Sequence, residues 1–208
     1  MRPTYSHFTA RAWQIIAALC ICISLSAQNF EADRDLFDAY QKEDMSVWKK
    51  HIDNASLQHS ASNTKLLLYE YGLCGYMADR DKTNAMTYIK QFRRDIEAQK
   101  ESLPAGYYEM YLSAVYIYEY KLRESFHPIK AMSLAKEATQ LAPDDPLVLS
   151  YYGTCMFYAP KPFGSKQEAL EWFNKAKAHF DGEQWQFCWV REATEMYIRQ
   201  CQEKLKKQ

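Results

Sequence analysis

The residue types that most often do chemistry are scattered along this chain of 208 residues. His51, His59, His127 and His179 each stand alone, without the H-E-x-x-H spacing that places two zinc ligands on one helix face. The sequence also lacks the G-x-S-x-G turn of a serine nucleophile and the glycine-rich loop that cradles phosphates. We therefore expect a protein that is not an enzyme and that uses no cofactor and no metal.

One acidic stretch begins like a calcium-binding loop. Asp79, Asp81 and Thr83 alternate as the first ligands of such a loop do. However, Asn84 occupies the position of the turn glycine, and Lys90 occupies the position of the bidentate glutamate. The stretch is better interpreted as a polar turn between two helices.

Four cysteines follow the first 27 residues: Cys74, Cys155, Cys188 and Cys201. They have no C-x-x-C spacing for zinc or redox chemistry. Cys188 and Cys201 are 13 residues apart on one expected helix, about 20 Å, which is too far for a disulfide. Cys155 and Cys188 form the geometrically possible pair, and buried free thiols are the favoured interpretation.

Residues 1–27 have the features of an export signal. Arg2 and Arg11 precede or flank an apolar run over residues 12–25, and Ala27 ends a short small-residue stretch suited to cleavage. An uncleaved anchor is the alternative, but this run is shorter than the roughly 20 residues of a spanning helix. We expect residues 28–208 to form a single domain in the periplasm or outside a bacterial cell, with no membrane span after cleavage.

The charge of the chain excludes one class of partner. The formal net charge is 0 over the whole sequence, and loss of Arg2 and Arg11 with no acidic residue lowers it to −2. Nucleic acids and anionic membrane surfaces require a basic field, which this composition does not provide. We therefore expect no nucleic-acid partner.

The elements that must position all these residues are predicted by a repeated spacing of small and apolar side chains. Offsets of 0, 4 and 7 occur twice, in Ala131, Ala135 and Ala138 and again in Ala169, Phe173 and Ala176. Between these two sets, offsets of 0, 3, 4 and 7 relate Leu149, Tyr152, Gly153 and Met156. Such offsets place side chains on one helix face, and alanine or glycine lets two helices approach closely.

This pattern resembles the tetratricopeptide repeat (TPR) family, whose unit is a pair of helices of about 34 residues. The resemblance covers residues 63–180 as three repeats, 63–99, 105–143 and 146–180. Gly72 matches the family glycine that lets the partner helix come close, whereas Val115 departs from it. The resemblance implies an all-α fold, a right-handed α-solenoid of antiparallel helix pairs.

The two ends of the domain are expected to cover this array. Residues 29–57 predict an N-terminal helical hairpin, with Asp44 as the N-cap of its second helix. Residues 183–206 predict one long capping helix with an i+4 ladder: Trp185, Trp189, Ala193, Tyr197, Cys201 and Leu205. Asp144 or Asp145, and Ser165, are expected to cap the two helices of the third repeat.

The resemblance also implies a binding surface, because the first helices of successive TPR repeats line a concave groove. The groove residues expected on this basis are Tyr69, Leu73, Tyr76, Leu112, Tyr116, Glu119, Tyr120, Phe157 and Tyr158. Tyrosine offers a large contact area at low entropic cost. The alternative is that many of these aromatic side chains pack between helices.

Two functions follow from these expectations. The first is an exported, non-enzymatic scaffold that binds a partner protein or peptide along the concave face. The second is a small-solute-binding or transporter-accessory protein of the cell envelope, with a closed pocket under the proline-rich elbow at residues 160–163. The sequence does not identify the partner or the oligomeric state.

Overall fold

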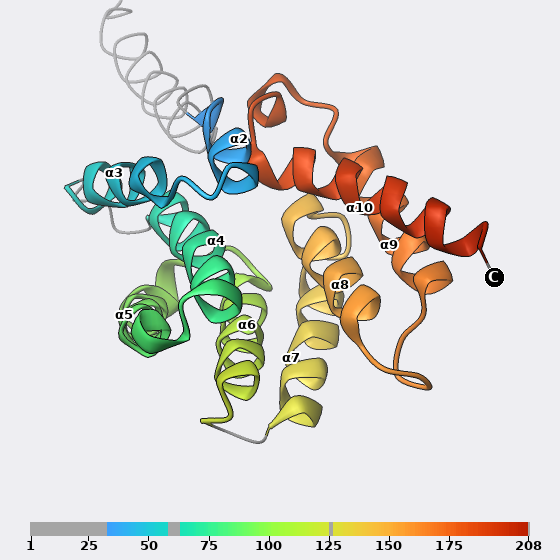
Figure 1. Cartoon of the computed structure of the whole chain (residues 1–208), viewed down its shortest axis with the longest axis horizontal. Helices are drawn as coiled ribbons and strands as arrows, with labels where there is room; N and C mark the ends of the chain where they lie inside the picture. The colour runs from blue at the N-terminus through green and yellow to red at the C-terminus, as the bar shows by residue number, and fades with distance from the viewer. Residues whose placement is uncertain (1–32, 58–62, 125–126, 208) are drawn as a thin grey trace, which may run out of the picture.

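The computed structural model describes residues 33–57, 63–124 and 127–207 (Figure 1). Within these ranges the regular structure is helical and contains no strand, which confirms the all-α prediction. The expected export signal at residues 1–27 lies outside the described residues, as does His59. None of the helices in these ranges combines the length and the apolarity needed to cross a membrane.

The helices follow one another with short connections. Their bounds are α2 Leu36–Gln41, α3 Met45–Ser56, α4 Thr64–Arg80, α5 Lys82–Gln99, α6 Tyr107–Leu122, α7 Pro128–Leu141, α8 Pro146–Tyr158, α9 Lys166–His179 and α10 Trp189–Leu205. Two 3₁₀ turns, η2 Lys100–Ser102 and η3 Glu183–Trp185, precede α6 and α10.

Three helices begin where the sequence predicts a cap. The side chains of Asp44 and Ser165 accept hydrogen bonds from backbone N–H groups in the first turns of α3 and α9. Of the two candidates before α8, Asp145 is the cap, and its Oδ1 accepts from two backbone N–H groups at 2.9 and 3.1 Å. Local sequence therefore determines where these helices start.

The middle of the chain packs as adjacent helix pairs, α4 with α5, α6 with α7 and α8 with α9 (Figure 1). In the last pair, a Cβ added at Gly153 would lie 2.8 Å from the Phe173 ring, so the glycine lets α9 approach α8. Ala169 and Ala176 beside Phe173 are completely buried. The close approach expected from the spacing is confirmed in this pair.

Gly72 has a different neighbour from the one expected. A Cβ at this position would lie 2.2 Å from the Trp48 ring on α3 and 3.2 Å from the Trp189 ring on α10. The glycine therefore makes room for two tryptophans outside its own helix pair, not for α5. A pattern of spacing shows where a close approach occurs, but it does not identify the neighbour.

The C-terminal segment differs from the predicted helix over 183–206. The α-helix begins at Trp189, after the separate 3₁₀ turn η3. Its buried stripe includes Thr194 and Ile198, whereas Ala193 and Tyr197 of the expected ladder are only partly buried. Burial of Thr194 is possible because its hydroxyl donates to the Val190 carbonyl at 2.7 Å and contacts the Ser150 hydroxyl at 2.6 Å.

The same helix also brings the two ends of the described chain together. α10 packs on α8 and α9 and also contacts α2 (Figure 1). Its first residue, Trp189, lies 5.2 Å from the Trp48 ring and 5.9 Å from the Tyr71 ring, between ring centroids. Just before it, the Phe187 ring lies 3.8 Å from the guanidinium carbon of Arg34. The helix expected as a terminal cap therefore connects the last helix pair to the N-terminal hairpin α2–α3.

Candidate binding surfaces

The cysteines belong to the core. Cys74, Cys155, Cys188 and Cys201 are free and buried, so the favoured interpretation is confirmed and Cys155 is not paired with Cys188. Burial raises the pKa of Cys155 and of Cys188 to about 12. Their thiols remain protonated at neutral pH and act as small apolar groups.

The acidic stretch spans the junction of α4 and α5: Asp79 lies in the last turn of α4, Asp81 is the single residue between the helices, and Thr83 lies in α5. Asp81 caps α5 by accepting a hydrogen bond from the Asn84 backbone N–H, and Asp79 forms an ion pair with Lys121 at 2.8 Å. Across the three described ranges, no group of three or more His, Cys, Asp and Glu side chains is placed to hold a metal ion.

The described histidines lie far apart in the sequence and have separate neighbours. His51 Nε2 lies 3.2 Å from Asp35 Oδ1, and His179 Nε2 lies 3.6 Å from Asp144 Oδ1. His127 packs edge-on against Tyr116, with 5.9 Å between ring centroids. These contacts join histidine to carboxylates and to a ring, and they bring no two of the described histidines together.

Four of the nine expected groove residues are part of the core. Tyr69, Leu73, Leu112 and Phe157 are buried, so they do not lie on an exposed groove in this structure. Tyr69 illustrates the reason, because its hydroxyl donates a 2.6 Å hydrogen bond to the buried carboxylate of Asp33. The N-terminal segment thus covers part of the face that the resemblance leaves open.

Two more expected groove residues make structural contacts with neighbouring helices. Glu119 accepts a 2.7 Å hydrogen bond from Arg93 on α5, whose guanidinium carbon lies 5.1 Å from the Tyr116 ring centroid. Lys130 Nζ on α7 lies 4.8 Å from the same ring. A hydrogen bond with Lys130 is the main cause that lowers the pKa of Tyr116. Tyr116 and Glu119 therefore tie α6 to the second helices of two pairs.

Of the three remaining tyrosines, Tyr120 and Tyr158 are exposed and Tyr76 is partly buried. Tyr76 and Tyr158 each pack against a tyrosine outside the predicted groove. Tyr76 packs against Tyr40 on α2 at 6.2 Å, and Tyr158 packs against Tyr197 on α10 at 6.1 Å, between ring centroids. Tyr158 is 63% exposed, and Tyr120 on α6 is 42% exposed. We call Tyr40, Tyr76, Tyr158 and Tyr197 the tyrosine surface.

Charged side chains of α4 and α6 lie next to the two tyrosine pairs. The pKa of Tyr40 is raised to about 12, mainly by burial, with smaller contributions from the nearby Asp79 and Tyr158. Lys121 on α6 pairs with Asp79 and also lies 5.8 Å from the Tyr158 ring centroid. Helices α2, α4, α6, α8 and α10 therefore all contribute to one region. The predicted groove did not include Tyr40 and Tyr197, because α2 and α10 lie outside the three predicted repeats.

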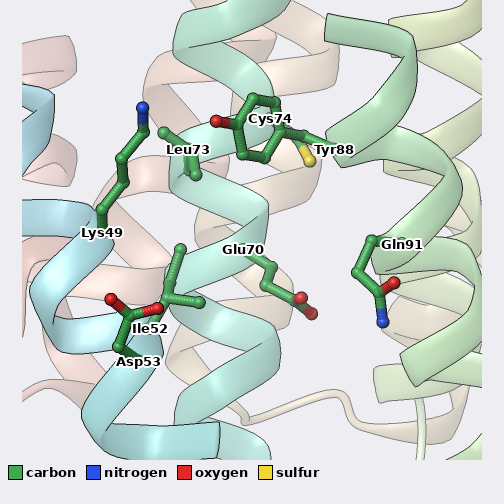
Figure 2. A pocket seen from close by; sticks show the side chains of 8 residues that line it. All are labelled: Lys49, Ile52, Asp53, Glu70, Leu73, Cys74, Tyr88 and Gln91. Carbon is green, nitrogen blue, oxygen red and sulfur yellow. The ribbon is translucent and has the colours of Figure 1, made fainter. Parts of the chain in front are cut away.

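A separate cavity of ≈ 280 Å³ lies between α3, α4 and α5 (Figure 2). It is lined by Lys49, Ile52, Asp53, Glu70, Leu73, Cys74, Tyr88 and Gln91. None of these residues belongs to the elbow at 160–163, where a pocket was expected. At the elbow, Lys166 donates to the Phe157 carbonyl, and its ammonium lies 3.7 Å from the Phe157 ring centroid.

The unusual residue of this cavity is Glu70, which projects from α4 toward α5 and Gln91 (Figure 2). Its side chain is only 7% exposed, and its Oε2 atom has no hydrogen-bond partner. The pKa of Glu70 is raised to about 9, mainly by burial and also by the charge and hydrogen bond of Asp95. Glu70 is therefore protonated at neutral pH. A lone glutamate between Tyr69 and Tyr71 in an apolar run was the sequence signal for it.

Comparison of the chain with protein-family models, with curated proteins and with solved structures finds no match. The tyrosine surface and the cavity are therefore interpreted from their own contacts.

Proposed function

We propose that this chain is an exported, non-enzymatic scaffold that binds a partner protein or peptide at the tyrosine surface. In this proposal, the pairs α4–α5, α6–α7 and α8–α9 are three TPR-like repeats of a right-handed solenoid. Support comes from the pairwise packing of these helices and from the close approach at Gly153. Export is proposed on the sequence of residues 1–27.

The observation that carries the proposal is the exposure of Tyr158 within a group of tyrosines from four helices. An exposed ring held by Tyr197, Phe157 and Lys121 is positioned before a partner arrives. Such a ring loses little conformational freedom on binding and offers both apolar area and a hydroxyl. These are the properties of residues that dominate protein interfaces.

The charges around the tyrosine surface indicate the kind of partner segment. Lys121 is paired with Asp79 at 2.8 Å, and Arg80 is paired with Glu43 at 2.9 Å. Because these charges already satisfy one another, a strongly charged segment gains little there. We therefore propose a segment with aromatic or aliphatic side chains and free backbone groups that hydrogen-bond to tyrosine hydroxyls.

The experiment places a photo-crosslinking residue on the surface. The chain without residues 1–27, carrying Tyr158→p-benzoylphenylalanine, is irradiated with an envelope extract of its host, and the crosslinked peptide is identified by mass spectrometry. A synthetic copy of that peptide should bind the unmodified chain and lose at least about tenfold in affinity, about 1.4 kcal/mol, with Tyr158→Ala.

The matched control is Tyr116, another tyrosine of the predicted groove, whose ring contacts Arg93 and Lys130. The crosslinker at position 116 should not label the same peptide, and Tyr116→Ala should leave the peptide affinity unchanged. Equal labelling at both positions, or equal affinity of the Tyr158→Ala variant, contradicts the assignment of this surface.

A specific observation also favours the second candidate function, a small-solute-binding or transporter-accessory protein. The cavity between α3, α4 and α5 is close in volume to the lower end of small-molecule sites, roughly 300 Å³. It is separate from the tyrosine surface, so the two functions can be tested independently.

A further inference from the structure

We propose that the cavity between α3, α4 and α5 binds a small organic cation, with a primary ammonium group against Glu70 and a short alkyl chain against the apolar wall. This inference rests on the contacts of the cavity and does not depend on the tyrosine surface.

The first argument is the unsatisfied carboxyl group. Glu70 Oε2 is buried without a hydrogen-bond partner, although buried polar atoms in proteins nearly always have one. The charged group that acts on Glu70 is the carboxyl of Asp95, and two adjacent carboxyl groups oppose each other's ionisation. In the free protein Glu70 is protonated and shares a hydrogen bond with Asp95, so a bound ammonium group would take the place of that proton and also contact the free Oε2 atom.

The second argument is the orientation of Asp95. Gln91 Nε2 donates a 2.7 Å hydrogen bond to Asp95 Oδ2, which holds this carboxylate on the same side of α5 as Gln91. Gln91 lines the cavity, and Glu70 points toward it (Figure 2). Two helices, α4 and α5, therefore supply the carboxyl groups of Glu70 and Asp95 at this end of the cavity.

The rest of the wall fits an alkylammonium ion. Ile52 and Leu73 supply apolar surface, and Tyr88 supplies an aromatic ring. The ammonium of Lys49, an exposed residue, lies 5.7 Å from the Tyr88 ring centroid, and Asp53 adds a carboxylate from α3 to the wall. The volume of ≈ 280 Å³ suits a small ligand.

Binding of a cation must be coupled to proton release. Glu70 is protonated in the free protein at neutral pH, and an ammonium group binds its ionised form. The affinity should therefore rise up to about tenfold per pH unit between pH 7 and the pKa of about 9, then level off. Close to one proton should be released per bound cation at pH 7.

The experiment uses three four-carbon probes that differ in the head group: butylammonium, butan-1-ol and butyrate. Calorimetric titration of the chain without residues 1–27, in buffers of different ionisation enthalpy, measures affinity and proton release. We expect butylammonium to bind at least tenfold more tightly than the other two probes, with an affinity that rises from pH 7 to pH 9. Equal binding of butan-1-ol, or preference for butyrate, would overturn the proposal.

Variants locate the site. Glu70→Gln keeps the shape of the side chain and should lower butylammonium affinity at least tenfold and abolish proton release. The matched control, Glu203→Gln at an exposed position of α10, should change neither. Carbon-13 NMR of the Glu70 carboxyl provides an independent readout, because butylammonium should lower its pKa. A pKa of Glu70 unaffected by butylammonium would contradict the proposal even if the probe binds elsewhere.

Discussion

The pairs α4–α5 and α8–α9 occupy equivalent places in the predicted repeats but differ in what they bury. α8 buries eleven of its thirteen residues, and no carboxylate is among the buried side chains of α8 or α9. α4 buries Glu70 in an otherwise similar helix, next to a cavity. Both pairs have a glycine at the close-approach position, Gly72 or Gly153, and an alanine early in the second helix.

The comparison of the two pairs indicates that helix packing alone does not explain the buried carboxyl of Glu70. One template of small and apolar residues is sufficient for α8–α9, so an ionisable group is not needed to join two helices. A buried carboxyl without full hydrogen bonding lowers stability. In natural proteins, residues that lower stability in this way are concentrated at functional sites. The α3–α4–α5 region is therefore the part of the array where we expect a ligand.

The largest effect should come from the rings that face the two glycines. Trp48→Ala and Phe173→Ala each remove a completely buried ring and should lower the free energy of unfolding by about 3–5 kcal/mol. Trp48→Ala should be at the upper end, because it also removes the 3.1 Å hydrogen bond from the indole N–H to the Leu36 carbonyl. Urea unfolding measures both free-energy changes, provided that the m-value is the same in the variants and the unmodified protein. A small cost for Trp48→Ala alone would show that α3 is loosely attached.

The dependence of stability on pH should distinguish the two pairs next. The pKa of Glu70 is about 9 in the folded chain and near its ordinary value when unfolded, so the folded state binds more protons between these values. Stability should therefore fall as pH rises, by up to about 1.4 kcal/mol per pH unit. Asp33, whose pKa burial raises to about 6, acts in the same direction but only below that pH. The part of the slope between pH 6 and pH 8 that Glu70→Gln removes is the contribution of Glu70.

Glu70→Gln should remove this fall in stability, and Asp33→Asn should leave it in place. The Asp33→Asn variant serves as the control because it changes another buried carboxyl of the N-terminal half. If the slope of unfolding free energy against pH is the same in the Glu70→Gln protein, the pKa of Glu70 is not raised by folding. The two helix pairs would then not differ in their electrostatics.

The smallest effect should come from the glycines themselves. A methyl group at Gly72 would meet Trp48 at 2.2 Å, and one at Gly153 would meet Phe173 at 2.8 Å. Alanine at either position should cost about 1–2 kcal/mol by overpacking, with the larger cost at Gly72. Thermal unfolding measures the difference. Gly75→Ala is the control, because its methyl group would lie 3.2 Å from the Tyr118 hydroxyl and alanine favours the helix by about 1 kcal/mol.

The sequence predicts helix positions better than it predicts neighbours. Asp44, Asp145 and Ser165 cap helices as expected, because a cap depends only on the next few residues. Gly72 was assigned a close approach correctly but the wrong partner, since its neighbour Trp48 lies outside the repeat pattern. The start of α10 was placed too early because an apolar ladder continues through the 3₁₀ turn at Glu183–Trp185.

The candidate sites were harder to predict for a related reason. Tyr76 and Tyr158 were expected on the binding face, but Tyr40 and Tyr197 join them only through the contacts of α2 and α10. Tyr69 and Phe157 have the same residue types as exposed groove residues and are nevertheless buried. Glu70 is distinguished by its raised pKa, which is caused by desolvation and by Asp95, a residue of the next helix. The spacing of residues within one helix does not predict how deeply a side chain is buried or which residue of another helix it contacts.

The contact between Trp48 and Trp189 has a consequence for how the protein reaches its native state. Trp48 belongs to the first helices of the described chain, and Trp189 opens the last one. During synthesis from the N-terminus, the indole of Trp48 does not meet Trp189 until the final segment emerges. Long-range contacts of this kind form late and slow the completion of folding. Removal of α10 should therefore leave the start of the chain incompletely packed, and not merely shorten its end.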